Sequence, residues 1–241
     1  MKDITELSVT QSRIYPPDRI PLTALNAGTN SELLRDKFNF KAVQQPDPSL
    51  PGGAGITFIN GLFSTLEGPL IIAKMSLDPR RIAIQVIGSS AQATLIHQRV
   101  WELLRSLVAP QMPFEDQPLT KSDETYCVVT LDVGFRDLIS PSLSEFFSRR
   151  GSGMLESGFA TVRAINLASL QFTIKYSTKD PGLIDRGITA GMDRALNFQP
   201  RIGTAPEDRR FFVSSPTDSD THLALIEAVE KQLLEHPAEI A

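Results

Sequence analysis

Three histidines, His97, His222 and His236, are the candidate bases for nucleophilic catalysis in this chain. A serine nucleophile needs a histidine and an acid within hydrogen-bond reach. His97 falls on or beside the apolar side of an expected helix, which predicts a packed histidine with one hydrogen bond. His222 lies in the first turn of the last expected helix, where the neighbouring Asp and Ser residues are expected as caps. We assign no catalytic residue, and a hydrolase that uses His222 or a pair of carboxylates stays open as an alternative.

The sequence motifs of several common enzyme classes are missing. The chain contains no HExxH zinc motif, no GxxxxGK[ST] phosphate loop and no GxSxG nucleophile elbow. Its single cysteine, Cys127, can form neither an intrachain disulfide nor a multi-cysteine metal site. We therefore expect no cofactor and no metal, and the balance favours a protein that is not an enzyme.

Paired arginines are the candidate contacts for an acidic partner. Arg149 and Arg150 precede Gly151-Ser152-Gly153, a loop in which guanidinium groups and backbone amides can converge on an anion. Two further Arg-Arg pairs occur in the chain. The candidate partner or anion contacts are therefore Arg149, Arg150, Ser152, Arg80, Arg81, Arg209 and Arg210.

Composition indicates an ordinary globular protein. The hydrophobic fraction is 41% and the charged fraction 22%, and the net charge of −4 mildly repels nucleic acid and anionic membranes. The N-terminal sequence MKDITELSVT lacks the apolar stretch of a secretory signal, and no apolar run approaches the roughly 20 residues of a membrane-spanning helix. We expect a cytoplasmic protein with no membrane contact.

Proline and glycine divide the chain. Residues 1–55 are expected to form an N-terminal arm with one helix from Ser31 to about Phe38, and residues 56–110 a first α+β half. Residues 111–124 are expected to be a proline-rich linker or crossover, and residues 125–241 a second α+β half.

The elements expected after the arm begin with a run of strands, of which Arg81–Ile87 directs Ile82, Ile84 and Val86 to one side. Asn60-Gly61 predicts a hairpin turn between two short strands. In the strand expected at Leu70–Leu77, one buried face is predicted to carry Ile71, Ala73, Met75 and Leu77. Later elements are a helix from Ser89 or Ser90 to about Val108, a strand over Tyr126–Phe135, a short helix from Pro141, two strands within Phe159–Tyr176, a helix over about Leu183–Leu196, a strand near Arg210–Val213 and a helix over Asp220–Leu234.

Two segments of the chain resemble each other. PRRIAIQVIGSS and DRRFFVSS both read Arg-Arg, apolar strand, Ser-Ser, and each leads into an amphipathic helix. Chance similarity of a common supersecondary pattern is the favoured explanation, and a duplicated strand-and-helix unit is the alternative. The fold class expected is α+β, with antiparallel meandering sheets and amphipathic helices packed on one face. A duplication would divide this fold into two related strand-plus-helix halves.

By elimination, the leading function is a noncatalytic subunit or adaptor that acts through protein contacts in a larger assembly. Its partner is another protein or a second copy of the chain. The alternative from a different class is a nucleic-acid-binding module that uses the paired arginines, for which binding must depend steeply on salt.

Overall fold

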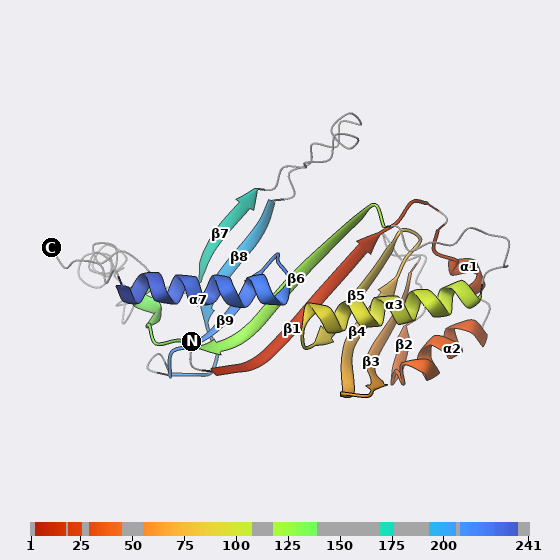
Figure 1. Ribbon diagram of the computed structural model, residues 1–241, viewed down its shortest axis with the longest axis horizontal. Coiled ribbons are helices and arrows are strands. Elements are labelled where there is room, and N and C mark those ends of the chain that lie inside the picture. The colour runs from red at the N-terminus through yellow and green to blue at the C-terminus, as the bar shows by residue number, and fades with distance from the viewer. Residues whose placement is uncertain are drawn as a thin grey trace, which may run out of the picture. The chain divides into compact units, whose positions relative to one another are not determined.

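The computed structural model describes residues 3–17, 19–25, 29–44, 55–107, 118–138, 169–175, 193–205 and 208–235. These residues form a mixed α+β fold with nine strands in one antiparallel sheet, as the sequence predicts at the level of fold class (Figure 1). The strand order is β2-β3-β4-β5-β1-β6-β9-β8-β7.

The bounds of the elements are as follows. The strands are β1 (Asp3–Ile14), β2 (Ala42–Gln44), β3 (Ile56–Thr65), β4 (Gly68–Leu77), β5 (Arg81–Ile87), β6 (Thr120–Thr130), β7 (Leu170–Lys175), β8 (Asp193–Pro200) and β9 (Arg210–Ser215). The helices are α1 (Leu22–Leu25), α2 (Thr29–Lys37), α3 (Ser90–Ser106), the 3₁₀ helix η1 (Phe135–Leu138) and α7 (Ser219–Glu235).

The chain divides into two compact units. The first unit contains Leu7–Thr125 and Thr217–Asp220. The second unit contains Met1–Glu6, Tyr126–Pro216 and Thr221–Ala241. Strands β1 and β6 each contribute residues to both units, so neither unit is one continuous stretch of sequence.

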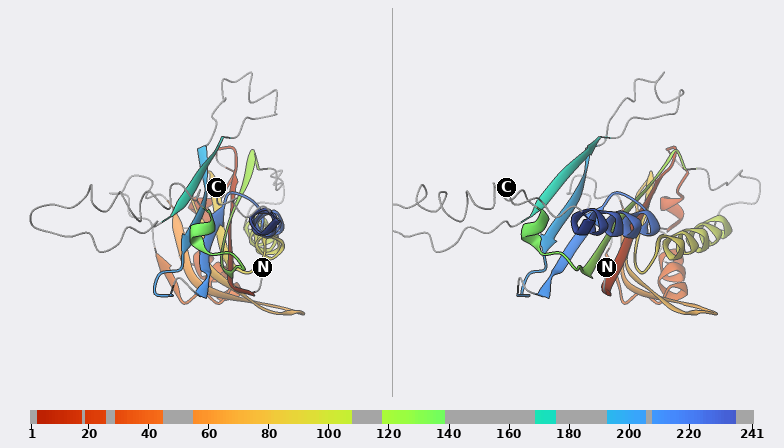
Figure 2. Two further views of the ribbon diagram at one scale, coloured as in Figure 1. Left: turned by 90° about the vertical axis from the view of Figure 1, so that its left-hand side faces the viewer. Right: turned by 60° about the vertical axis from the view of Figure 1, so that its left-hand side comes forward.

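The first unit has a core between α3 and its strands. Residues Ile82, Ile84 and Val86 of β5 are buried, and they belong to one cluster with Ile96 and Val100 of α3. We call the strand face that carries these residues the inner face, and the opposite one the outer face. Figure 2 shows α3 lying to one side of the strands of this unit. Burial of this apolar surface is the main stabilising contribution to the unit.

Helix α3 begins where the sequence predicts. Ser89 is its N-cap, and the Ser89 hydroxyl accepts a hydrogen bond from the Gln92 backbone N–H while the Gln92 side chain accepts one from the Ser89 N–H. This reciprocal arrangement satisfies amides that have no partner within the helix. Gly88, with φ 143°, provides the turn from β5 into the cap.

The predicted hairpin at Asn60-Gly61 is wrong. Both residues lie inside the continuous strand β3, which pairs with β4 from Ile56↔Leu77 to Thr65↔Gly68. Asn60 does have the left-handed backbone, φ 55°, that makes Asn-Gly a turn signal. Here the conformation serves a strand irregularity, and the hairpin turn comes later, before Gly68.

The predicted faces of β4 are also wrong in part. The register between β4 and β5 shifts between Ile72 and Lys74. Since each extra residue reverses the faces of the residues beyond it, Ile72 is buried together with Met75, and Ile71 points to the outer face. Strict alternation in the sequence therefore predicts the wrong side for Ile71.

The second unit contains three paired strands and most of helix α7. Strand β7 pairs with β8 and β8 with β9, both antiparallel, through registers such as Phe172↔Leu196 and Phe198↔Val213. The expected strand near Arg210–Val213 and the expected final helix are confirmed as β9 and α7.

Several other expectations have a clear outcome. The helix expected to end near Leu196 is wrong at its end, because Asp193–Pro200 is strand β8, with Leu196 and Phe198 buried at strand spacing. Residues 3–14, within the expected arm, form β1, and the expected linker includes the first residues of β6. The short helix after Pro141 lies outside the described residues. The expected domain boundaries at residues 55, 110 and 124 stay predictions.

Candidate functional site

The first arginine pair stabilises a turn. Arg81 starts β5, and its Nε lies 3.1 Å from Oδ2 of Asp78. The backbone N–H of Arg80 donates to Oδ1 of the same carboxylate at 3.0 Å. Asp78 therefore closes the β4–β5 turn and partly neutralises this pair.

The second arginine pair has a similar local role. Arg209 has a left-handed backbone, φ 50°, and its guanidinium donates to the backbone carbonyl of Asp132. Arg210 is exposed at the start of β9. The candidate residues Arg149, Arg150 and Ser152 lie outside the described residues. Among the described residues each unit contains one Arg-Arg pair, so the structure brings no two pairs together within a unit.

The second unit contains a buried cysteine, histidine and serine in contact. Nε2 of His222, on α7, lies 3.3 Å from Sγ of Cys127, on β6, and Nδ1 lies 2.7 Å from Oγ of Ser215, on β9. These residue types and contacts are those of a nucleophile with its base. All three side chains are buried, however, with at most 1% of their surface exposed.

The protonation states of this cluster oppose catalysis. Burial raises the pKa of the Cys127 thiol to about 12 and lowers the pKa of His222 to about 4. A reactive cysteine requires the reverse order, in which the thiol loses its proton to the imidazole. The cluster is therefore a neutral, hydrogen-bonded part of the interior, between α7 and the strands it contacts.

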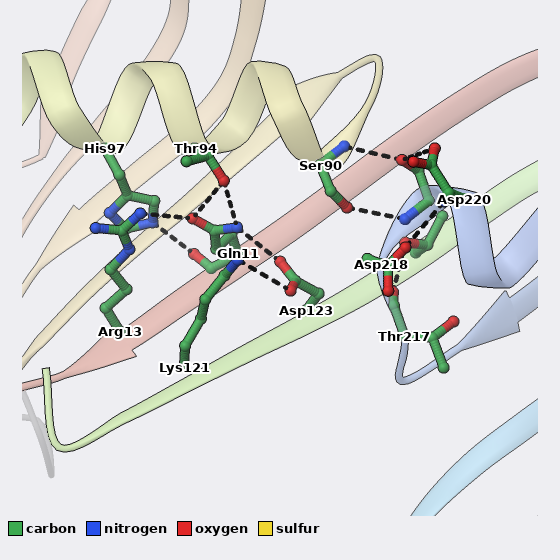
Figure 3. Close-up of polar contacts among 12 residues, drawn as sticks. Gln11, Arg13, Ser90, Thr94, His97, Lys121, Asp123, Thr217, Asp218 and Asp220 are labelled. Atoms are coloured by element: carbon green, nitrogen blue, oxygen red, sulfur yellow. Dashed lines mark hydrogen bonds and ion pairs between the residues drawn. The ribbon is translucent and has the colours of Figure 1, made fainter.

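His97 belongs to a buried polar network in the first unit, shown in Figure 3. Its Nε2 lies 3.1 Å from the backbone carbonyl of Gln11, on β1. The Gln11 side-chain amide donates to Asp123, on β6, at 2.8 Å and to Thr94, on α3, at 3.1 Å. One glutamine thus links the helix to two strands, and the expectation of a packed histidine is confirmed.

Burial and the nearby charge of Arg13 lower the pKa of His97 to about 3. An imidazole that is neutral at neutral pH has the protonation state of a general base. The side chain offers almost no surface to a substrate, because His97 is 1% exposed and lies on the buried side of α3. Arg13 in turn donates to the side-chain oxygen of Gln11 at 3.3 Å. The network orders the interior and offers no entry to a reactant.

The first unit exposes a row of neighbouring apolar side chains on its strands. Leu62 on β3, Ile71 on β4 and Ile87 on β5 are directly paired across the strands. Their exposed fractions are 40%, 49% and 48%, respectively. Large apolar residues scattered singly on a surface are normal, whereas neighbouring ones commonly mark contact sites. We call these three residues the apolar row.

The outer face around the apolar row has little charge. The registers place Thr57, Ile59, Ser64, Ser76, Ala83, Gln85, Thr10 and Ser12 on this face of the first unit. Lys74 and Arg81 are its charged members among the outward residues of β3, β4 and β5, and Arg81 is paired with Asp78. Few charges interrupt this face, and depletion of charged residues is a compositional signal of an interface core.

Sequence reasoning missed the apolar row for a physical reason. Leu62 and Ile71 occur in apolar strand segments, and such segments are normally read as core. The register shift near Ala73 places Ile71 outside and its neighbour Ile72 inside. Ile87 could have been recognised, because it extends the period-two pattern of β5 on the polar side, opposite Val86.

Other classes of site are restricted by the described residues. Within them, no group of three or more His, Cys, Asp or Glu side chains is placed to hold a metal ion. None of the helices in the described ranges has the length and apolar character to cross a membrane.

Comparison with known proteins adds no relative. The chain matches no protein-family model, and no curated protein matches it significantly.

Proposed function

We propose that this protein is a noncatalytic subunit or adaptor that binds a protein partner through the outer face of its first unit. The apolar row is the observation that carries this proposal, because it places three exposed branched side chains side by side on neighbouring strands. Covering these side chains would remove apolar surface from water, which is the main favourable term in protein association. A partner with an apolar patch and few charges fits this surface.

The same face favours a protein over nucleic acid. A nucleic-acid interface neutralises several phosphates with Lys and Arg, and single-strand binders add exposed aromatic rings for base stacking. The outward residues of β3, β4 and β5 include Lys74 and Arg81 as cations and no aromatic ring. Asp78 already contacts Arg81. These counts support the adaptor over the nucleic-acid alternative.

The buried chemistry supports a binding function rather than hydrolysis. His97 and His222 are neutral and inaccessible, and the thiol of Cys127 keeps its proton. A hydrolase that used His222 would need a route for substrate to a ring with no exposed surface. A metal-dependent version of the carboxylate hydrolase has no ligand set among the described residues, since they contain no group of three or more His, Cys, Asp or Glu placed to hold a metal ion.

We also infer that the chain consists of two related halves. In the first unit the strand order is β1-β5-β4-β3, and α3 follows β5. The order β6-β9-β8-β7, with α7 after β9, repeats this connectivity. Arg81 and Arg210 begin the equivalent strands, and serines precede or begin both helices. A duplication accounts for all of these likenesses at once.

The experiment for the adaptor proposal is purification of the tagged protein from its own cells under gentle conditions. Native mass and mass spectrometry then identify what accompanies it. We expect one defined companion in a fixed ratio with the native sequence, and its loss when Leu62, Ile71 and Ile87 are all replaced by threonine. Ile202→Thr is the matched control, because Ile202 is 92% exposed and lies in the second unit. A companion that survives the triple substitution, or a single free species, contradicts the proposal.

A further inference from the structure

A pocket of about 450 Å³ opens on the first unit, away from the apolar row. It lies between the C-terminal end of α2, strand β3 and the second half of α3. The depression is largely open to solvent, and its volume lies within the range of about 300–1,000 Å³ found for small-molecule sites. The residues that line it are Lys37, Phe63, Arg99, Glu102, Leu103 and Ser106.

The pocket has an apolar part that is fixed by the core. The ring of Phe63 lies 5.4 Å from the ring of Phe38, which is fully buried. Phe63 and Leu103 both pack against the core cluster while remaining partly accessible. An apolar ligand therefore meets a surface whose shape is already set, and binding does not have to order it.

The charged residues of the pocket are not balanced. Arg99 and Glu102, one turn apart on α3, form an ion pair at 2.8 Å and offset each other. The Ser106 hydroxyl donates to the Leu103 carbonyl at 2.6 Å. Lys37 is exposed at the end of α2 and makes no ion pair with any other described residue. Among its described lining residues the pocket thus combines an apolar wall with one cation, Lys37, that has no described ion-pair partner.

A structural role for Lys37 is the simpler alternative. A cation in the last turn of a helix interacts favourably with the carbonyl end of the helix dipole. That interaction explains why a lysine stands at this position but requires no pocket beside it. The two roles differ in what they predict, because only a ligand-binding role makes an anionic head group important for affinity.

We propose that the pocket binds a small organic carboxylate with an apolar body, such as an arylalkyl or medium-chain acid. The apolar body packs on Phe63 and Leu103, and the carboxylate accepts a charge-assisted hydrogen bond from the ammonium group of Lys37. This inference is independent of the adaptor proposal, because none of the pocket residues belongs to the apolar row.

The test is an NMR titration of the full chain with 4-phenylbutyrate and with its neutral amide. An exposed ion pair changes affinity by up to about fivefold. We therefore expect the acid to bind about three- to fivefold more tightly than the amide. Lys37→Gln should abolish this preference by weakening only the acid, whereas Leu103→Ala should weaken both ligands equally and keep the preference.

The matched control is Lys231→Gln on α7, which removes an exposed lysine outside the pocket and should leave both affinities unchanged. Thermal melts of all variants verify that they fold. Equal binding of acid and amide, a preference that persists in Lys37→Gln, or an absence of binding by both compounds overturns the proposal.

Discussion

The hydroxyl of Ser90 accepts a hydrogen bond from the backbone N–H of Ser219 at 2.8 Å, and the hydroxyl of Ser219 accepts one from the N–H of Ser90 at 3.1 Å. Figure 3 includes both interactions around Ser90. The two residues begin α3 and α7, where first-turn amides lack a partner within their own helix. Each serine therefore satisfies an amide at the start of the other helix.

Replacing Ser219 by alanine should lower the free energy of unfolding by about 1 kcal/mol, because it leaves the Ser90 amide without its acceptor. Ser90→Ala should have an effect of similar size for the reciprocal reason. Urea denaturation monitored by circular dichroism measures both. Ser106→Ala, on the exposed end of α3, is the control and should change stability by less than about 0.5 kcal/mol. Equal losses of stability in all three variants would show that the reciprocal pair contributes no more than an exposed serine does.

Neighbouring isoleucines on β4 should respond very differently to threonine. Ile71→Thr should change the free energy of unfolding by less than about 1 kcal/mol, because half of this side chain is already exposed. Ile72→Thr should cost about 2–4 kcal/mol, because it places a hydroxyl in a fully buried position. Equilibrium denaturation of the two variants tests the register shift. If Ile71→Thr destabilised the protein more than Ile72→Thr, the side chains of β4 would alternate strictly and the apolar row would not exist.

Stability should fall as the pH drops through the range in which free histidine titrates. The pKa values of His97 and His222 are lowered to about 3 and about 4 in the folded state, from 6.5. The unfolded state therefore binds more protons below pH 6.5, so the stabilisation is complete above that pH and is lost as the pH falls towards 4. Each histidine should cost about 2 kcal/mol between pH 7.5 and pH 5.

The variant His97→Gln isolates the contribution of one histidine to this pH dependence. Glutamine keeps a donor that can reach the carbonyl of Gln11 but does not titrate. Its stability should therefore decline less steeply between pH 7.5 and pH 5, by about 2 kcal/mol, in denaturation curves recorded across this range. A slope identical to that of the native sequence would contradict the neutral, buried state of His97.

Cys127 should be almost unreactive in the folded protein. Its thiol is 1% exposed and burial raises its pKa to about 12, so the thiolate that attacks a disulfide reagent is scarce. Labelling with a chromogenic disulfide should be at least about 100-fold slower in buffer than in denaturant. A cysteine placed at exposed Ser106, in a Cys127→Ser background, is the control and should react rapidly in both. Rapid native labelling of Cys127 would reopen the case for cysteine chemistry.

Much of the fold could be predicted from local sequence patterns. The Ser-Ser signal and the apolar spacing from Ala93 to Leu104 define α3, and the period-two pattern defines β5 with Ile82, Ile84 and Val86 inside. These elements were predictable because each buries one continuous side and has a strong cap or turn at its end. The α+β class follows from runs of consecutive strands along the chain, such as β3, β4 and β5 before α3.

The parts that could not be predicted depend on contacts between distant residues. Residues 8–14 of β1 pair with β5, and Gln11 and Arg13 on the inner face of β1 make a polar pattern that local reading does not assign to a buried strand. Their burial is possible because Thr94 and Asp123, remote in sequence, provide partners for Gln11. The apolar row likewise depends on a register shift that only strand pairing defines.

The most direct test of the central claim is photocrosslinking from the outer face in the native cells. A benzophenone amino acid at Ile71 should yield one crosslinked product of defined mass, because the partner covers the apolar row. The same amino acid at Gln98, exposed on α3, should yield none. A product from position 71 whose second component is a distinct protein supports the adaptor function. The adaptor function is contradicted if position 71 yields no product, or if positions 71 and 98 yield equal amounts. A product that contains two copies of this chain would show self-association in place of an adaptor function.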